Sequence, residues 1–132
     1  MPTISGPFDV TMQGEPPLDE RDGISLGRAR FDKKFHGALE ATSVVFMTSA
    51  RTTIPNSAAY VAIERIEGTV EGRRGSFCVT HLATMNRGAE SLLISVVPDS
   101  GTGELIGLSG QMKIRIVERK HFYDFEYALP AQ

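Results

Sequence analysis

A carboxylate, an imidazole and a phenol fall on one face of a predicted β-hairpin in the middle of this chain. The segments AYVAIERIEGTV and RRGSFCVTHLA alternate apolar and polar residues on either side of Glu71-Gly72, a pair that favours a two-residue turn. Counting cross-strand pairs back from this turn places Tyr60, Glu64 and His81 on the same, otherwise apolar, face. This face is where we expect any chemistry, although no motif identifies a substrate.

A carboxylate in an apolar interior is costly unless it is hydrogen-bonded, and burial tends to raise its pKa. An adjacent imidazole could share its proton, so Glu64 and His81 are candidate acid-base residues. The structural alternative is that these two side chains satisfy each other, or satisfy Arg65 or Tyr127, and only fix the strand register.

A second hairpin near the end of the chain follows from a turn at Glu118-Arg119. The same counting sets Tyr123 on one face, and Tyr127 continues that face. The aromatic row is most simply core packing. Buried phenol hydroxyls need partners, however, so these tyrosines join the candidate ligand-binding residues Tyr60, Glu64 and His81.

Counting from the turns brings two pairs of opposite charge face to face, of which one is predicted as an ion pair and one is left open. Lys113 lies across from Asp124 on the wet face of the last hairpin, where a surface ion pair is expected. A turn at His36-Gly37 places Lys33 opposite Glu40 on a largely apolar face, so either a bulge shifts the register or a charged pair is buried. That face also carries Phe31, Phe35, Val44 and Phe46.

Other reactive residues do not combine into a familiar site. Cys78 and His81 are three residues apart on one strand, so their side chains leave opposite faces, and Ser76 fails as a nucleophile by a similar argument. The spacing of His36, His81 and His121 matches no standard metal pattern, and only the last two are expected to point inward. We therefore predict no metal and no cofactor. The loop SGTGELIG lacks the lysine of a nucleotide-binding loop, so its glycines are assigned to a turn.

The elements that must position these residues are strands. Thirteen glycines and seven prolines interrupt the chain at short intervals, and no long segment keeps a helical period. Eight strands are predicted, over residues 4–14, 24–35, 39–50, 57–70, 74–85, 89–97, 111–117 and 121–129. Residues 15–22 are expected to form a solvated loop, and residues 104–108 one helical turn. The fold class is all-β, and we favour an eight-stranded antiparallel barrel over a two-sheet sandwich because closure removes exposed edges.

Composition limits the partners. A chain of 132 residues suits one barrel domain over residues 1–132, and 14 basic against 16 acidic residues leave no basic stripe for nucleic acid. No apolar stretch is long enough for a membrane helix, and no export signal is evident, so we expect a cytoplasmic protein. Val61, Ile63 and Leu82 fall on the outer face of the central hairpin, which predicts a homo-oligomer.

Nearly the whole chain resembles a group of uncharacterised bacterial proteins of the domain-of-unknown-function type. The resemblance is carried by three motifs in the expected order, SAAYVAIERIEGTVEGRRGSFCVTH, VVPDSGTGELIGL and KHFYDFEYALP. It implies a closed or nearly closed barrel like that of allene oxide cyclases, allows for self-association and brings no established activity. Two positions depart from the group: Arg119 stands where a glycine is usual, and Thr80 where a glutamine often precedes the histidine.

The sequence supports three hypotheses. We favour a barrel that binds a small amphipathic molecule through the five candidate residues above. The second is an isomerase or cyclase in which Glu64 or His81 moves a proton while a tyrosine hydroxyl steadies negative charge. The third is an oligomeric module with a filled barrel and no ligand.

Overall fold

The computed structural model describes residues 2–131, which form nine β-strands and one short 3-10 turn. The elements are β1 (Thr3–Gly14), β2 (Asp19–Arg21), β3 (Ile24–Phe35), β4 (Leu39–Arg51), β5 (Ala58–Val70), β6 (Arg73–Asn86), β7 (Ala89–Val96), η1 (Gly103–Leu105), β8 (Ser109–Val117) and β9 (Lys120–Ala128). No helical segment within residues 2–131 is long and apolar enough to cross a membrane.

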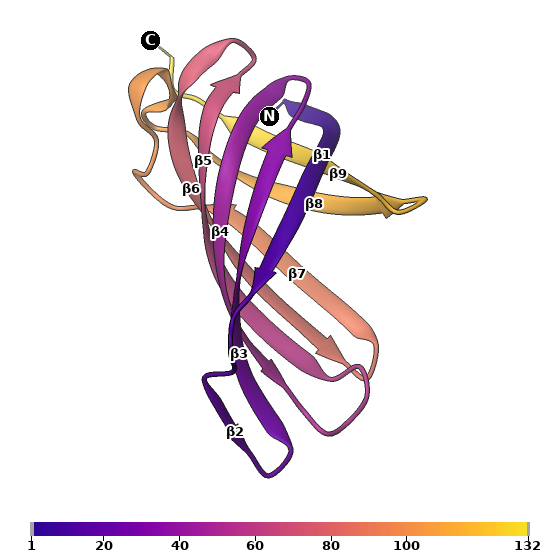
Figure 1. The fold of residues 1–132 in the computed structure, drawn as a ribbon. Coiled ribbons are helices and arrows are strands. Elements are labelled where there is room, and N and C mark those ends of the chain that lie inside the picture. Colours follow the sequence, from indigo (N-terminus) through magenta and orange to yellow (C-terminus); the bar gives the residue numbers. More distant parts are fainter. Residues whose placement is uncertain (1, 132) are drawn as a thin grey trace.

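Eight of these strands close into an antiparallel barrel, which confirms the predicted fold class (Figure 1). The order is β1-β9-β8-β7-β6-β5-β4-β3, and β1 closes the ring by pairing with β3 as well as with β9. The short β2 pairs with β3 outside the ring. Every strand pair is antiparallel, as expected for strands joined by short turns.

Both predicted hairpin registers are confirmed. Val70 pairs with Arg73 across the turn formed by Glu71 (φ 47°) and Gly72 (φ 84°). Positive φ at both central residues gives a turn whose twist matches that of the flanking strands. Glu118 (φ 50°) and Arg119 (φ 67°) adopt the same left-handed conformation, so the last hairpin turns as expected although it has no glycine.

The structure differs from the simplest sequence reading at residues 15–22 and at the connection before β4. Residues 15–22 are not wholly loop, because β2 pairs there with the start of β3; its residues are all exposed, so no apolar pattern marks the strand. Lys33 pairs with Ser43 rather than with Glu40, so of the two alternatives for this face the shifted register holds. The reason is that the first β3–β4 pair joins Phe35 to Ala41, so five residues lie between the paired strands instead of two, and this odd difference reverses the side-chain parity of β4.

The reversed parity moves Phe46 to the outside, where 62% of its surface is exposed. In the last hairpin the register of Lys113 and Asp124 is confirmed, but the ion pair forms elsewhere. Arg115 Nε lies 2.6 Å from Asp124 Oδ2, so Arg115 takes the place predicted for Lys113.

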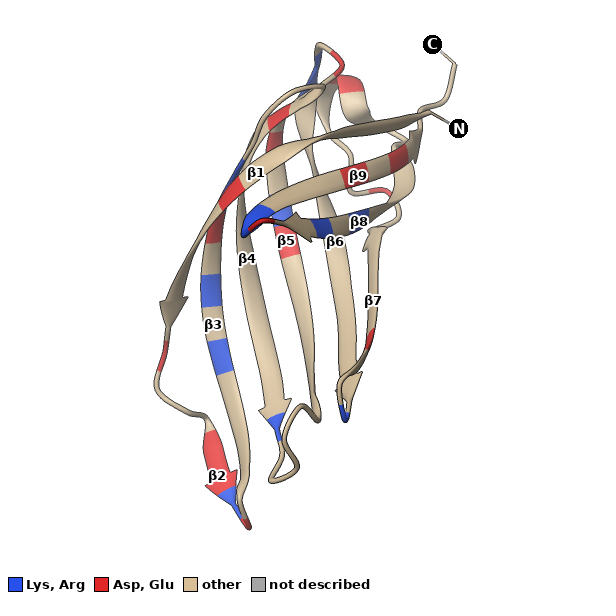
Figure 2. Ribbon diagram, turned by 90° about the vertical axis from the view of Figure 1, so that its right-hand side faces the viewer, with Lys and Arg blue, Asp and Glu red and all other residues tan. Residues whose placement is uncertain are grey.

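The barrel has a closed end and an open end. β1, β8 and β9 cross only one part of the sheet that β3–β7 form, and the rest of that curved sheet extends beyond them (Figures 1 and 2). Only Ile94 and Ser95 of β7 pair with β8 within the described chain. We call residues 47–51, 58–62, 83–86 and 89–93 the open end; the closed end is the part of the barrel that β1, β8 and β9 surround.

Aromatic side chains fill the closed end. Phe77 and Phe125 stack with ring centroids 5.6 Å apart, and Tyr127 stacks on Phe125 at 5.5 Å. Phe35 packs edge-on against Tyr123 at 5.6 Å. All five of these rings are buried, so this half of the barrel has a solid core.

The loop before β8 covers the part of β6 that β7 leaves unpaired. Thr102 N donates to Ser76 O at 2.8 Å, and Ser76 N donates to Thr102 Oγ1 at 2.9 Å. The loop comes so close that a Cβ on Gly75 would lie 2.1 Å from Thr102 O. A glycine is therefore required at position 75 for this side of the closed end to be sealed.

Candidate functional site

Four neighbouring strands each contribute one polar side chain to a buried cluster at the boundary between the two ends. Glu64 from β5 is fully buried and His81 from β6 is 4% exposed. His81 Nε2 lies 2.8 Å from Glu64 Oε1, and Lys33 Nζ from β3 lies 3.3 Å from the same oxygen. Ser43 Oγ from β4 donates to Glu64 Oε2 at 2.5 Å. Glu64 is thus the centre of a hydrogen-bonded network.

The surroundings keep Glu64 ionised. Burial alone would raise the pKa of this carboxyl, as the sequence suggested. The hydrogen bond from His81, the charge of Lys33 and the hydrogen bond from Ser43 together outweigh burial and lower the pKa below its ordinary value. Because a carboxylate can only accept, the proton in the His81 contact belongs to Nε2.

The other imidazole nitrogen has no partner. His81 Nδ1 is the one buried side-chain polar atom in residues 2–131 without a hydrogen bond. Buried polar groups are nearly always paired, so an unpaired one at the edge of a packed core calls for an explanation. It leaves one hydrogen-bonding position of the cluster free.

Aromatic rings hold Lys33 in its buried position. Its ammonium lies 5.0 Å from the ring centroid of Phe8 and 5.7 Å from that of Phe35, close enough for cation-π attraction. Together with Glu64 these contacts compensate the loss of water around the charge. Lys33 is therefore part of the site, although counting from the sequence placed it only opposite Glu40.

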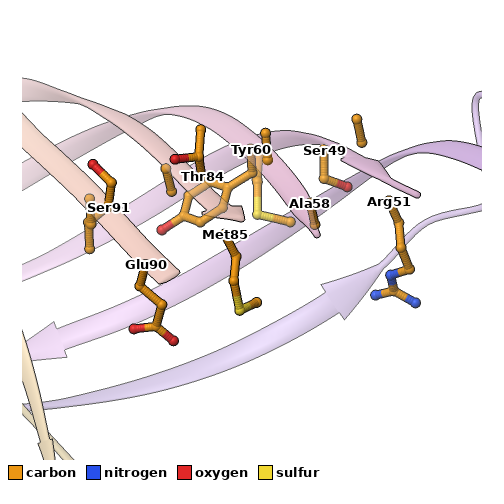
Figure 3. A pocket seen from close by; sticks show the side chains of 13 residues that line it. Ser49, Arg51, Ala58, Tyr60, Thr84, Met85, Glu90 and Ser91 are labelled. Carbon is orange, nitrogen blue, oxygen red and sulfur yellow. The ribbon is translucent and has the colours of Figure 1, made fainter. Parts of the chain in front are cut away.

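A hollow of about 380 Å³ opens on the inner face of the open end, next to the cluster. It is lined by Met47, Ser49, Ala50, Arg51, Ala58, Ala59, Tyr60, Ala83, Thr84, Met85, Glu90, Ser91 and Leu92. Figure 3 shows Tyr60 reaching across it toward Ser91 and Glu90. Most of the lining is apolar, and Arg51 and Glu90 supply its charged groups.

Tyr60 connects the hollow with the cluster. Its side chain lines the hollow, and its ring centroid lies 6.4 Å from that of His81. Burial, and after it the charge of Glu64, raises the pKa of Tyr60 above its ordinary value. The phenol therefore keeps its proton and can donate a hydrogen bond at neutral pH.

Two of the five predicted site residues lie elsewhere. Tyr123 donates to His36 O at 2.8 Å and accepts from Leu39 N at 3.0 Å, which ties β9 to the loop before β4. Tyr127 donates to the Glu71 carboxylate, and burial and that carboxylate raise the pKa of Tyr127 to about 12. Both hydroxyls are occupied in the closed end, so the structure brings together only Tyr60, Glu64 and His81.

The remaining reactive side chains stay apart. Ser76 Oγ bonds to Thr102 Oγ1 at 2.7 Å, and the backbone N of Cys78 donates to Ser100, which places both residues beneath the loop before β8. His36 contacts Asp9 at 2.9 Å, and His121 packs against Phe8 with ring centroids 5.3 Å apart. No group of three or more metal-binding side chains occurs in the part of the chain that the structure describes.

Comparisons with known proteins agree with this barrel and add no activity. Residues 4–127 match the profile of a family described as protein of unknown function (DUF3224). A crystal structure of a DUF3224 protein of unknown function from Shewanella oneidensis MR-1 is 42% identical and superimposes with a TM-score of 0.94, covering 99% of each chain. A search of curated proteins finds no match. The chain therefore belongs to the DUF3224 family.

Proposed function

We propose that the open end binds a small, mainly apolar molecule that carries one hydrogen-bond donor. The observation that carries this proposal is the unpaired, buried Nδ1 of His81, whose ring lies 6.4 Å, between ring centroids, from the Tyr60 ring that lines an apolar hollow. A volume of about 380 Å³ lies within the range of small-molecule sites, which are largely apolar with a few placed polar groups. Met47 and Met85 in the lining can adapt to different shapes.

The charges of the cluster favour a donor on the ligand. Lys33 balances the charge of Glu64, so a neutral imidazole leaves the buried cluster without net charge. A neutral ring with its proton on Nε2 has a lone pair on Nδ1, which accepts. A hydroxyl or amide N–H satisfies this atom, whereas a carboxylate would add a second anion near Glu64.

In this proposal Tyr60 is the movable element. Its ring lies between the hollow and the imidazole, and a change of its rotamer would open a path from one to the other. The phenol hydroxyl can then donate to an acceptor on the same ligand. The site would thus bind an amphipathic molecule by its polar end.

The test uses two probes of nearly the same shape, 2-naphthol and 2-methoxynaphthalene, which lacks the donor. We expect fluorescence titration to show that 2-naphthol binds up to about tenfold more tightly, because only this probe forms the hydrogen bond to Nδ1, which contributes about 0.5–1.5 kcal/mol. His81→Phe should abolish this preference, and His121→Phe, the same change in the closed end, should keep it.

A second variant protects the test if His81→Phe fails to fold. Ala83→Leu places a larger side chain in the hollow and leaves the Glu64 cluster intact, so it should weaken the binding of both probes. Equal affinity of the two probes for the wild-type protein, or no binding of either, would overturn the proposal.

Acid-base catalysis is a second candidate function. The 2.8 Å contact with Glu64 fixes the tautomer of His81 and leaves Nδ1 free, as in a general base oriented by a carboxylate. With 2-acetylnaphthalene as the probe, Nδ1 would take a proton from the methyl carbon, Tyr60 would donate to the enolate oxygen, and a solvent deuteron would return to carbon. Deuterium in the methyl group, measured by NMR in D2O, supports this function if His81→Phe removes it and His121→Phe does not. Deuterium exchange into the methyl group that is no faster than in buffer would contradict catalysis and leave ligand binding as the proposed function.

Three expectations from the sequence stay predictions. The first is the likeness to the allene oxide cyclase barrel, which concerns only the fold and implies no activity for this chain. A cytoplasmic location awaits fractionation of cells that produce the protein. The third is the oligomeric module with a filled barrel, which agrees with the aromatic core of the closed end. It would be favoured if the wild-type protein bound none of the probes.

A further inference from the structure

The two borders of the open end differ in how their backbone is covered. At the β3 border, β2 pairs with residues 24–26, and Gly14 of β1 pairs with Ala29. At the other border, residues 89–93 of β7 pair with β6 on one side and with no described strand on the other. Figure 1 shows β8 turning away from β7 above this segment.

The bare edge of β7 has few of the features that prevent pairing with another strand. Its five residues, AESLL, include one charged side chain and neither lysine nor proline. All five are exposed, with Leu92 at 42% and Leu93 at 49%. An exposed row of backbone donors and acceptors flanked by leucines is a template for strand addition.

We infer that this edge pairs with the same edge of a second copy of the chain, antiparallel about a two-fold axis at Ser91. When all five free residues pair, Ser91 lies opposite the partner's Ser91, Glu90 lies opposite the partner's Leu92, and Ala89 lies opposite the partner's Leu93. Moving the two-fold axis from Ser91 to Glu90, which is a register shift of two residues toward the turn, would place two Glu90 carboxylates opposite each other, which is unfavourable. The charge pattern of the edge therefore suits its own copy in the fully paired register.

The second copy also adds to the proposed site. Glu90, Ser91 and Leu92 line the hollow of the open end. Pairing at β7 places the partner's Leu92 and the partner's Glu90 beside that wall, so each hollow is extended by residues of the other copy. Dimerisation is inferred from the unpaired edge of β7 alone, so it does not require that the open end binds a ligand.

The outer apolar face is the competing surface for self-association. Phe46, Val61, Ile63 and Leu82 are each more than half exposed, and register places Phe46 beside Ile63 and Val61 beside Leu82. This face has no feature that selects a partner or an orientation. At the β7 edge, by contrast, backbone pairing sets the orientation and the position of Glu90 favours a second copy of the chain. A dimer through this face is thus an outcome that the experiment must detect.

A charge exchange at Ser91 tests the edge. Sedimentation equilibrium should find a dimer of the wild-type protein, and Ser91→Lys and Ser91→Glu should each raise the dimer dissociation constant about fivefold or more, because like charges face each other at the axis. Mixing the two variants should restore the dimer, since Lys then faces Glu. Thr11→Lys, on the exposed side of β1, is the control and should leave the dimer unchanged.

A cross-link gives an independent readout. In the Cys78→Ser background, Ser91→Cys should form an intermolecular disulfide on mild oxidation, because facing residues of antiparallel strands are about 4.5–5.5 Å apart between Cα atoms. Thr11→Cys should not. A monomer at all concentrations, or a dimer that Ile63→Lys dissociates and the Ser91 variants do not, would overturn the inference.

Discussion

The closed and open ends of the barrel share strands β4–β7, which keep the same alternation throughout, yet only the closed end, where β1, β8 and β9 complete the ring, is packed. On the inner face of β6, Phe77 and Val79 are at most 1% exposed, His81 is 4% exposed, Ala83 is 9% exposed, and Met85 is only partly buried. The gradient follows the distance from β8 and β9, which cover the first residues of this row and not the last (Figure 2). Burial in this barrel is therefore set by which other strands reach a residue.

The polar cluster lies where the packing changes. Above it, rings stack on one another; below it, small and flexible side chains line a hollow. The Glu64 cluster is therefore packed against the core on the side of the closed end and lies near the hollow on the side of the open end. The comparison predicts that substitutions toward the closed end affect mainly stability, and that substitutions toward the open end affect mainly binding.

The largest effect is expected for Glu64→Gln. Removing the carboxylate leaves the buried ammonium of Lys33 without its counter-ion, and breaking a buried pair in this way costs about 3–5 kcal/mol. Urea unfolding should show this loss, while Glu67→Gln on the exposed face of the same strand should change the free energy of unfolding by less than about 0.5 kcal/mol. Similar small losses for both variants would mean that the boundary cluster does not support the closed end.

The pH dependence of stability should report the same group. The pKa of Glu64 is lowered in the folded state, so its contribution to stability is present above the pKa of the unfolded chain, about 4.3, and is lost as pH falls through the folded value. The difference in free energy of unfolding between the wild-type protein and Glu64→Gln should therefore narrow below about pH 4. Asp124, whose pKa is also lowered, chiefly by Arg115, titrates in both proteins and cancels in this difference. If this difference in free energy of unfolding stayed constant from pH 7 to pH 2, the lowered pKa of Glu64 would be contradicted.

A smaller loss is expected for Tyr123→Phe in the closed end. The change removes a hydroxyl that bonds to His36 O and Leu39 N, and leaving such buried groups unpaired costs about 1–3 kcal/mol. Thermal unfolding should show a lower melting temperature and unchanged probe binding. Weaker binding of 2-naphthol by this variant at unchanged stability would return Tyr123 to the ligand site and blur the distinction between the two ends.

The sequence predicted the faces of the central hairpin because its turn is short and unambiguous. Glu71-Gly72 fixes the pairing, and an antiparallel register then determines on which side Glu64 and His81 lie. Counting from His36-Gly37 did not place Lys33, since five residues instead of two separate the first β3–β4 pair, and the odd difference inverts the parity of the next strand. Lys33 was recognisable as a charged residue among aromatics, but Ser43 carried no signal of its own.

The open end was not predictable from alternation. The inner row of β6 continues through Ala83 and Met85 with the same period as in the core, because the pattern records which face a side chain takes and not what lies across from it. The alternation also does not show that β8 pairs with β7 at only two residues of the described chain. A weak signal was present in side-chain size, since the row changes from Phe77 to Ala83 along the strand.

The smallest change in stability is expected for Tyr60→Phe at the start of the open end. The Tyr60 side chain is half-buried and lines the hollow, so losing its hydroxyl should change the free energy of unfolding by less than about 0.5 kcal/mol. Its effect on binding should separate the two proposed functions. Affinity for 2-naphthol should change little, because that probe donates to His81, whereas deuterium exchange into 2-acetylnaphthalene should slow about tenfold or more when the donor to the enolate oxygen is lost. A stability loss as large as that of Tyr123→Phe would show that the open end is packed as tightly as the closed end, and the contrast between the two would no longer hold.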